Sequence, residues 1–387
     1  MKFPKITVWR VIFAAIMLSG LAATYQRVFH GLGGSTNLSD KFPWGLWIGF
    51  DVMGGVALAA GGFTLVAMVH IFNIKTYRPV LRPAILTAFL GYSLVVVGLL
   101  FDLGRPDRLW HPLVMWNPHS VMFEVAWCVT LYSTVLFLEF LPLVFEKFGL
   151  HKPLAWIHNI SVPLMILGVL LSTLHQSSLG TLFLIVPEKE YPLWYSPLLP
   201  VMFFISSLAA GLAMTIFESW HSSRAFGRAL ELPLLASMGR VLAVVLSVYL
   251  WVRFLDMAHR HVFSLLLRNR METWLFLLEM GLMIVPTVLL YQKSVRWRPG
   301  ALYACAVMVV FGLVANRLNV GITGIEAGSG THYVPKWSEM AVTLSIIAAG
   351  FAIFRAIAGY FPVFEAHSHE DAPAEQAETE ADPVVAG

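Results

Sequence analysis

The chain has 387 residues, of which 58% are hydrophobic and 13% are charged, and its mean hydropathy is +0.72. These values exclude an ordinary soluble protein, in which charged residues approach about a quarter of the sequence. The net charge is only +3, and we expect a lipid bilayer, with no nucleic acid, as the partner of this chain.

Ten apolar stretches are long enough to cross a membrane. The hydrocarbon core of roughly 30 Å needs about 20 residues of helix, and the sequence predicts spans near residues 8–25, 45–72, 83–102, 120–145, 156–176, 197–219, 234–256, 273–292, 299–317 and 338–360. The predicted fold class is all-α, a polytopic membrane bundle of about ten transmembrane helices. The first stretch could instead be a cleaved signal peptide, but no clear cleavage site follows it and we favour a first anchor.

Lysine and arginine predict the orientation. When the ends and loops are assigned alternately to the two sides, one side holds 15 of these residues and the other 11, which together make the 26 of the chain. The positive-inside rule then places both termini in the cytoplasm. We predict a transmembrane helical domain over residues 1–364. Residues 365–387 contain seven acids, which predicts an acidic, disordered cytoplasmic tail.

The loops assigned to the outer side are longer than the inner ones and rich in Gly, Pro, His and Trp, above all over residues 103–119 and 318–337. Loops of this length in a compact bundle usually form functional or partner-binding surfaces. Tryptophan also anchors helices at the membrane surface, and for the Trp residues alone we favour that role.

Ionisable side chains inside the spans gather toward the outer ends. Charge within a membrane is costly, so such groups usually face the bundle interior, a cavity or a proton path. The outer third contains Asp51, Asp102, Glu124, His175, Arg253, Asp256, Glu279 and Arg317. Arg253 and Asp256 lie three residues apart, which favours a structural ion pair. We expect Arg317 to neutralise Glu279 across two helices.

Asp102, Glu124 and His175 lie on consecutive spans and beside outer loops. Consecutive spans are often neighbours, so we predict that these three side chains form a cluster beneath the loop-rich face. For each one alone, a structural role and a chemical role both remain open.

Glu139 and Glu218 lie near the cytoplasmic ends of their spans. Fifteen residues separate Glu124 from Glu139, about 22 Å of helix rise, so one helix carries a carboxylate toward each membrane surface. We predict a proton path that includes Glu139, Glu218 and Glu124. The alternative is that Glu139 only reaches the inner interface with its polar tip.

The chain lacks the patterns of several cofactors. Cys128 and Cys305 are single, so neither an iron–sulfur cluster nor covalent haem is expected. No two histidines share a depth on two spans, which argues against b-type haem, and we predict no metal site. Nucleotide-binding fingerprints are also absent from the sequence.

Eight strings of the chain resemble one family, the NrfD/polysulfide-reductase membrane subunits. They are FPWGLWIGFD (42–51), RPAILTAFLGYS (82–93), FDLGRP (101–106), SVMFE (120–124), LEFLPLVFEKFG (138–149), LHQSSLG (174–180), IFES (216–219) and THYVPKWSE (331–339). The resemblance runs from about residue 27 to 360. Within the family, it is closest to the integral membrane subunits, often labelled cytochrome b subunits, of hydrogenase-2-type periplasmic nickel–iron hydrogenases.

The resemblance implies a quinone-reactive subunit in the bacterial cytoplasmic (inner) membrane. It would receive electrons from a periplasmic ferredoxin-like iron–sulfur subunit, which nickel–iron hydrogenase large and small subunits supply. It also implies a menaquinone pocket near the periplasmic side. We assign Asp51, Asp102, Glu124 and His175 to that pocket, with Glu124 as the acid/base group nearest the quinone head and His175 and Asp102 behind it.

Three alternatives stay open. The partner complex could serve polysulfide, tetrathionate or sulfoxide chemistry. A secondary transporter or proton channel also uses intramembrane acids, although the acids here avoid the membrane centre and no clear internal repeat is visible. A purely structural anchor would leave Glu124 and His175 without a role.

Overall fold

The computed structural model describes residues 7–364, and the predicted acidic tail lies outside them. Ten helical segments are long and apolar enough to span a membrane, which confirms the predicted all-α bundle. They are α1 (Val8–Ser35), an interrupted span at Trp47–Ile71, η3 and α4 (Lys75–Val80 and Leu81–Asp102), α6 (Val121–Phe148), α7 (His151–Thr181), α8 (Leu199–Phe226), α9 (Leu232–His259), α10 (Met271–Tyr291), α12 continued by η7 and α13 (Pro299–Leu318, Asn319–Thr323 and Gly324–Ser329), and α14 (Trp337–Tyr360).

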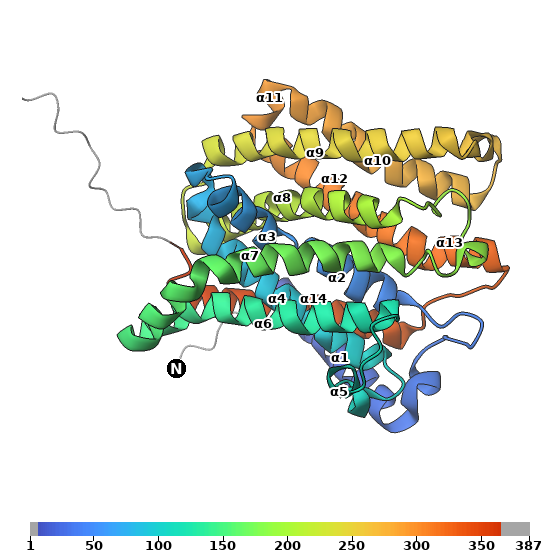
Figure 1. Ribbon diagram of the computed structural model, residues 1–387, viewed down its shortest axis with the longest axis horizontal. Coiled ribbons are helices and arrows are strands. Elements are labelled where there is room, and N and C mark those ends of the chain that lie inside the picture. The colour runs from blue at the N-terminus through green and yellow to red at the C-terminus, as the bar shows by residue number, and fades with distance from the viewer. Residues whose placement is uncertain (1–6, 365–387) are drawn as a thin grey trace, which may run out of the picture.

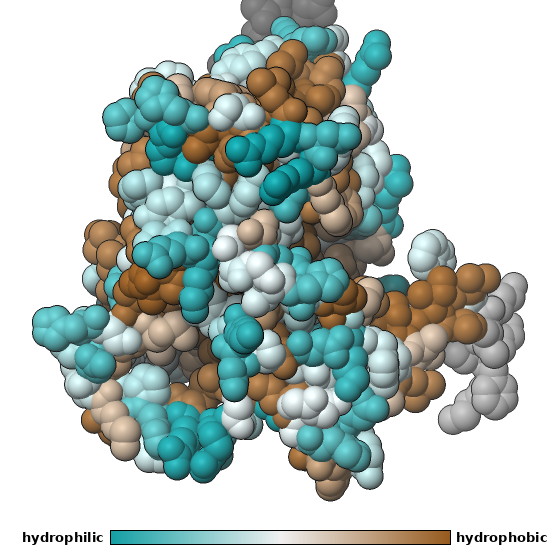
Figure 2. Space-filling model, turned by 90° about the vertical axis from the view of Figure 1, so that its right-hand side faces the viewer, coloured by the Kyte–Doolittle hydropathy of each residue, from teal (hydrophilic) through white to brown (hydrophobic). Residues whose placement is uncertain are grey.

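The long helices run side by side, so the bundle has two distinct ends (Figure 1). The loop-rich end carries the long connections 36–46, 103–120, 182–198, 260–270 and 330–336. They contain the short elements η4 (Pro106–Arg108), α5 (His111–Val114), η5 (Pro187–Lys189) and η6 (Val262–Leu267). Figure 2 shows this end face-on, where hydrophilic residues cover much of the surface with hydrophobic side chains between them. The short-loop end holds α11 (Lys293–Arg296) and both ends of the described chain.

Eight of the ten spans form two groups, and α14 contacts α4 of one of them. Helices α8, α9, α10 and α12 pack on one another, and α4, α6, α7 and the second span form the other group. Helix α1 packs mainly against α14. In the most apolar window of α1 only 11% of the residues are buried, compared with 83% in the second span. The second span is therefore central and α1 peripheral.

The second span is not a continuous α-helix. It consists of the π-helix η1 (Trp47–Gly54), α2 (Gly55–Leu58), α3 (Gly61–Val66) and the π-helix η2 (Ala67–Ile71). Its glycines allow close backbone approach: a β-carbon at Gly211 of α8 would lie 2.7 Å from the backbone nitrogen of Gly61. π-Turns change the direction of the side chains that follow them, and η1 carries Asp51.

The expected Arg253–Asp256 pair is wrong, whereas Arg317 and Glu279 do interact electrostatically across α12 and α10. Asp256 pairs with Arg260 at 2.7 Å, because Arg253 reaches across to the carbonyl oxygen of Leu193 at 2.6 Å. Glu279 and Arg317 do not pair directly: the Asn316 amide donates to Glu279 at 2.8 Å and accepts from Arg317 at 2.6 Å. An amide bridge thus joins these two buried charges.

Candidate functional site

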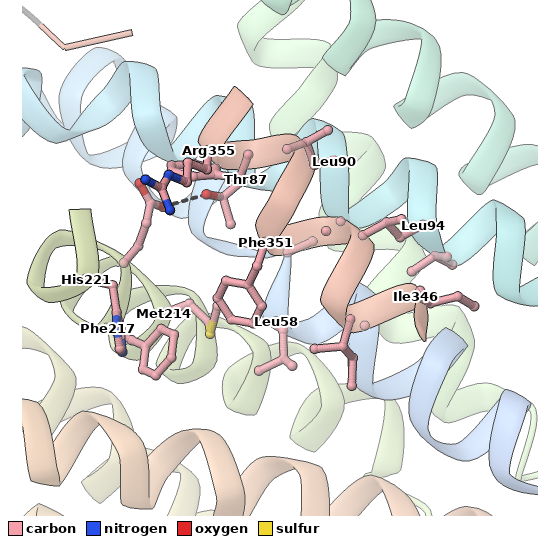
Figure 3. A pocket seen from close by; sticks show the side chains of 18 of the residues that line it. Leu58, Thr87, Leu90, Leu94, Met214, Phe217, His221, Ile346, Phe351 and Arg355 are labelled. Atoms are coloured by element: carbon pink, nitrogen blue, oxygen red, sulfur yellow. Dashed lines mark hydrogen bonds between the residues drawn. The ribbon is translucent and has the colours of Figure 1, made fainter. Parts of the chain in front are cut away.

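A cavity of about 460 Å³ lies between the second span, α4, α8 and α14 (Figure 3). Its walls are mostly apolar, and they include Leu58, Leu90, Leu94, Met214 and Phe351. The volume is in the range of pockets that bind drug-sized organic ligands, about 300–1,000 Å³. This cavity can accept an apolar ligand.

Asp51 lines the end of the pocket nearer the loop-rich end. Its side chain is 5% exposed, and its Oδ2 atom accepts a hydrogen bond of 2.7 Å from Thr343 of α14. The residue packs against Gly98 of α4. Burial with a single fixed hydroxyl donor leaves the second carboxyl oxygen able to hold or release a proton.

Glu218 lines the opposite end of the same pocket, and Thr87 of α4 donates a hydrogen bond of 2.5 Å to its Oε2 atom. Thr87 and Gly98 are eleven residues apart on α4, which is about 16 Å of helix rise. The pocket thus has one carboxylate at each end of a long apolar passage.

A second, smaller cavity of about 50 Å³ shares Glu218 and Ser222 with the pocket. Its other lining residues include Ser219, Ser223 and Arg228 of the short-loop end. Apolar residues such as Val80 and Leu230 line it as well, and a space of this size with several polar groups can hold water. Glu218 therefore lies between the apolar pocket and a polar vestibule.

The other face of α4 contacts a column of buried polar side chains, formed by Tyr92, Tyr132, Ser172 and His175. Tyr92 Oη lies 3.0 Å from Nδ1 of His175, and the rings of Tyr92 and Tyr132 have centroids 4.6 Å apart. Nε2 of His175 has no hydrogen-bond partner among the described residues, and the Ser172 hydroxyl is next to the hydroxyls of Tyr92 and Tyr132. Buried polar atoms are usually paired with protein or water, so ordered water is expected along this column.

Glu124 and Glu139 of α6 lie toward the two ends of this column. Ser178, one helical turn after His175, donates a hydrogen bond to Glu124. Glu139 is next to Gly168 of α7, and its Oε1 atom is buried without a partner. Sequence reasoning placed a carboxylate at each end but missed the tyrosines between them. The sequence did contain a signal for them, because Tyr92 and Tyr132 lie at matching depth on two predicted spans.

The predicted cluster of Asp102, Glu124 and His175 is not joined by any hydrogen bond or ion pair within residues 7–364. Asp102 interacts electrostatically with Glu339 and Arg27, which come from α14 and α1. Its Oδ1 atom is buried and unpartnered. The structure thus associates Asp102 with Asp51, whereas Glu124 and His175 belong to the column.

Two ionisable groups of the loop-rich end are buried outside the spans. The Tyr333 hydroxyl donates to Glu339 and accepts from the Leu46 backbone at 2.9 Å, and burial raises the pKa of this phenol above its usual range. Glu190 is 4% exposed with neither carboxyl oxygen bonded. Burial raises the pKa of Glu190 well above its usual value, although nearby Arg253 opposes that shift.

No group of three or more His, Cys, Asp or Glu side chains within residues 7–364 is arranged to hold a metal ion. Cys128 and Cys305 are free and buried. The predicted absence of haem stays a prediction.

The family model described as polysulphide reductase, NrfD, matches residues 34–327. A protein from Nitratidesulfovibrio vulgaris is 40% identical over 92% of this chain and 94% of its own length. The probable Ni/Fe-hydrogenase 2 b-type cytochrome subunit of Escherichia coli is 30% identical over 91% of each chain. The menaquinone reductase integral membrane subunit of N. vulgaris is 29% identical over 93% of this chain and 92% of its own length.

Proposed function

Because the chain belongs to the polysulphide reductase NrfD family, we propose that it is the quinone-reactive membrane subunit of a respiratory uptake hydrogenase complex. It passes electrons from a periplasmic iron–sulfur subunit to menaquinone. In this proposal the loop-rich end faces the periplasm, both termini lie in the cytoplasm, and the membrane is the bacterial inner membrane.

The observation that carries the proposal is the pocket between α4, α8, α14 and the second span. A quinone needs an apolar slot for its isoprenoid tail and a polar site with an acid/base group for its head. The pocket offers apolar walls and, at the loop-rich end, the buried carboxyl of Asp51. Electrons must come from a partner at that end, since no redox cofactor is expected in this chain.

We assign the quinone head to Asp51, because Asp51 lines the pocket and Glu124 does not. Thr343 orients the carboxyl group, which then donates a proton to a reduced quinone oxygen. Asp102 interacts electrostatically with Asp51 and serves as the next proton-holding group toward the loop-rich surface. Glu124 and His175 handle protons in the column.

The proton route has two candidate entrances from the cytoplasmic side. The polar vestibule leads to Glu218, and the column runs from Glu139 past Tyr132 and His175 toward Glu124. Acids at this depth in a membrane need water or polar partners. The column contains buried polar atoms without a protein partner, and water can bind to these atoms. Proton uptake from the cytoplasm would make quinone reduction electrogenic.

The nearest alternative is a membrane subunit of another NrfD-type oxidoreductase, acting with polysulfide, tetrathionate or sulfoxide. The match to the family model described as polysulphide reductase, NrfD, is the observation that keeps this open. A transporter or proton channel would need a continuous polar passage, whereas apolar walls separate Asp51 from Glu218 in the pocket.

The deciding experiment is to purify the chain from mildly solubilised membranes, identify its attached subunits and assay hydrogen-dependent menaquinone reduction. We expect nickel–iron large and small subunits and an iron–sulfur subunit. The Asp51→Asn variant should assemble normally, and its rate of quinone reduction should fall about 10²–10⁴-fold, as expected for the loss of a general acid. Recovery of a catalytic subunit other than a nickel–iron hydrogenase would replace the hydrogenase assignment, and full activity of Asp51→Asn would reject the head site.

A further inference from the structure

The short-loop end of the pocket carries more polar groups than the Asp51 end. Its lining includes Thr87 of α4, Glu218, His221 and Ser222 of α8, and Arg355 of α14. Figure 3 shows Thr87, His221 and Arg355 at one side of the cavity, and Leu94 and Ile346 at the other. A site that only held the end of an apolar tail would not need these groups.

Aromatic rings accompany these polar groups. Phe217 and His221 have ring centroids 4.5 Å apart, and Phe351 also lines the pocket. Nε2 of His221 lies 2.9 Å from the hydroxyl of Tyr303, so the second ring nitrogen remains for a ligand. Ring faces with hydrogen-bonding groups beside them are what a flat, carbonyl-bearing head group requires.

The charges at this end favour a neutral head. Glu218 and Arg355 have opposite charges when both are ionised and line the same end. A ligand that carries a phosphate or a carboxylate group would be repelled by the carboxylate of Glu218. A quinone carbonyl has no charge and accepts hydrogen bonds from His221 or Ser222 without that repulsion.

We propose that the short-loop end of the pocket is a second binding station for a quinone head group, about 16 Å from Asp51 by the helix rise of α4. The inference rests on the proposed function, because the ligand class is that of the same pocket. A quinone bound here has its head far from the donor at the loop-rich end. It therefore occupies the pocket without being reduced, and must reorient or exchange before it reacts at Asp51.

The experiment uses the intact complex in native membranes. The probe is a 1,4-naphthoquinone with a ring azide and a short isoprenoid tail, activated by light, followed by proteolysis and mass spectrometry. We expect labelled peptides from two regions. The first is the short-loop end, at Phe217–Ser222 of α8 or Phe351–Arg355 of α14, and the second is η1 around Asp51. Excess menaquinone should suppress both labels.

Variants separate the two stations. The double variant His221→Phe, Ser222→Ala removes two hydrogen-bonding groups, so labelling at the short-loop end should fall by about tenfold or more while labelling near Asp51 persists. His158→Phe is the matched control, because this histidine is exposed on α7 and does not line the pocket. Labelling confined to the Asp51 end, or a short-loop label that survives excess menaquinone, overturns the second station. Absence of label from the whole pocket overturns the proposed function as well.

Discussion

The side chain of Asp51 lies directly against Gly98 of α4: a β-carbon at position 98 would be 2.9 Å from the Asp51 Cβ atom. Backbone geometry does not demand glycine here, since Gly98 is within a regular helix. The missing side chain instead makes room for the carboxyl group that closes the pocket.

Gly98→Ala should therefore displace Asp51 and slow quinone reduction. A shift of about 1 Å in a reacting group can cost about a hundredfold in rate, so we expect a loss of about ten- to a hundredfold in hydrogen-dependent menaquinone reduction. Gly359→Ala on α14 is the control, because a β-carbon there meets nothing within 4 Å. Equal rates for the two variants would show that the position of Asp51 is unimportant.

The column between Glu139 and Glu124 should carry protons. In sealed proteoliposomes with hydrogenase outside, wild-type quinone reduction should build a potential that is negative inside. Glu139→Gln and Tyr132→Phe should lower the rate at which this potential forms, while subunit assembly is unchanged. Glu188→Gln is the control, because Glu188 is exposed, and it should form the potential at the wild-type rate. The same measurement on Glu218→Gln tests the vestibule. If all these variants match the wild type, the protons do not come from the cytoplasm by these routes.

Glu190 predicts a pH-dependent stability. Its folded-state pKa is raised by burial, so the folded state holds the proton more tightly than the unfolded state does. Stability from this group is complete below the ordinary glutamate pKa, about 4.3, and decreases as pH rises through the raised value. Glu190→Gln removes the titration. In thermal unfolding in detergent, the variant should become more stable relative to the wild type as the pH is raised from about 4.3; a difference that does not change with pH would contradict the argument.

Arg27 fastens α1 to the end of α4. Its guanidinium donates to the carbonyl oxygens of Phe101 at 2.7 Å and Leu103 at 2.6 Å. Loss of these charge-assisted bonds in Arg27→Gln should cost about 1–3 kcal/mol, seen as a lower unfolding temperature and faster proteolysis near residue 36. The control is Arg108→Gln, an exposed loop residue. Unchanged proteolysis would mean that α14 alone holds α1.

The proposed orientation is open to direct measurement. A cysteine placed at residue 110, in the connection between α4 and α6, should react with an impermeant maleimide added to intact spheroplasts, because we place this loop outside. A cysteine at residue 293 should react only after the membrane is opened. The reverse labelling pattern would place the loop-rich end in the cytoplasm. A periplasmic electron-donor subunit could then not bind at the Asp51 end.

Much of the fold could be predicted because hydrophobic length alone determines a membrane span. The predicted span 234–256 and the observed α9 (Leu232–His259) agree closely. Helix rotation was harder. Asp102, Glu124 and His175 lie toward the same, loop-rich end of the bundle, yet Asp102 turns toward α1 and α14 while His175 turns toward Tyr92. Depth follows from position in the sequence, but the facing of each helix depends on packing against partners that are far away in the chain.

Asp51 shows the same limit in another form. In an uninterrupted α-helix, sequence position alone would determine the direction in which the Asp51 side chain points. Because η1 is a π-helix, that direction is different. The Arg253 and Asp256 pair failed because a loop carbonyl, at Leu193, competes for the guanidinium. Such carbonyls have no signature in a sequence.

The pairing of α1 with α14 has a consequence for biosynthesis. Gly20 of α1 packs against Ser345 of α14, and the backbone of Asn37, just after α1, donates to Glu339 at 3.0 Å. Because α1 precedes α14 in the chain, there is an interval during synthesis in which α1 is in the membrane without its main packing partner. During that interval its apolar faces are shielded only by lipid or by helper proteins of the membrane. A nascent chain that stops before residue 337 lacks α14, and we expect membrane proteases to cleave its unpaired α1.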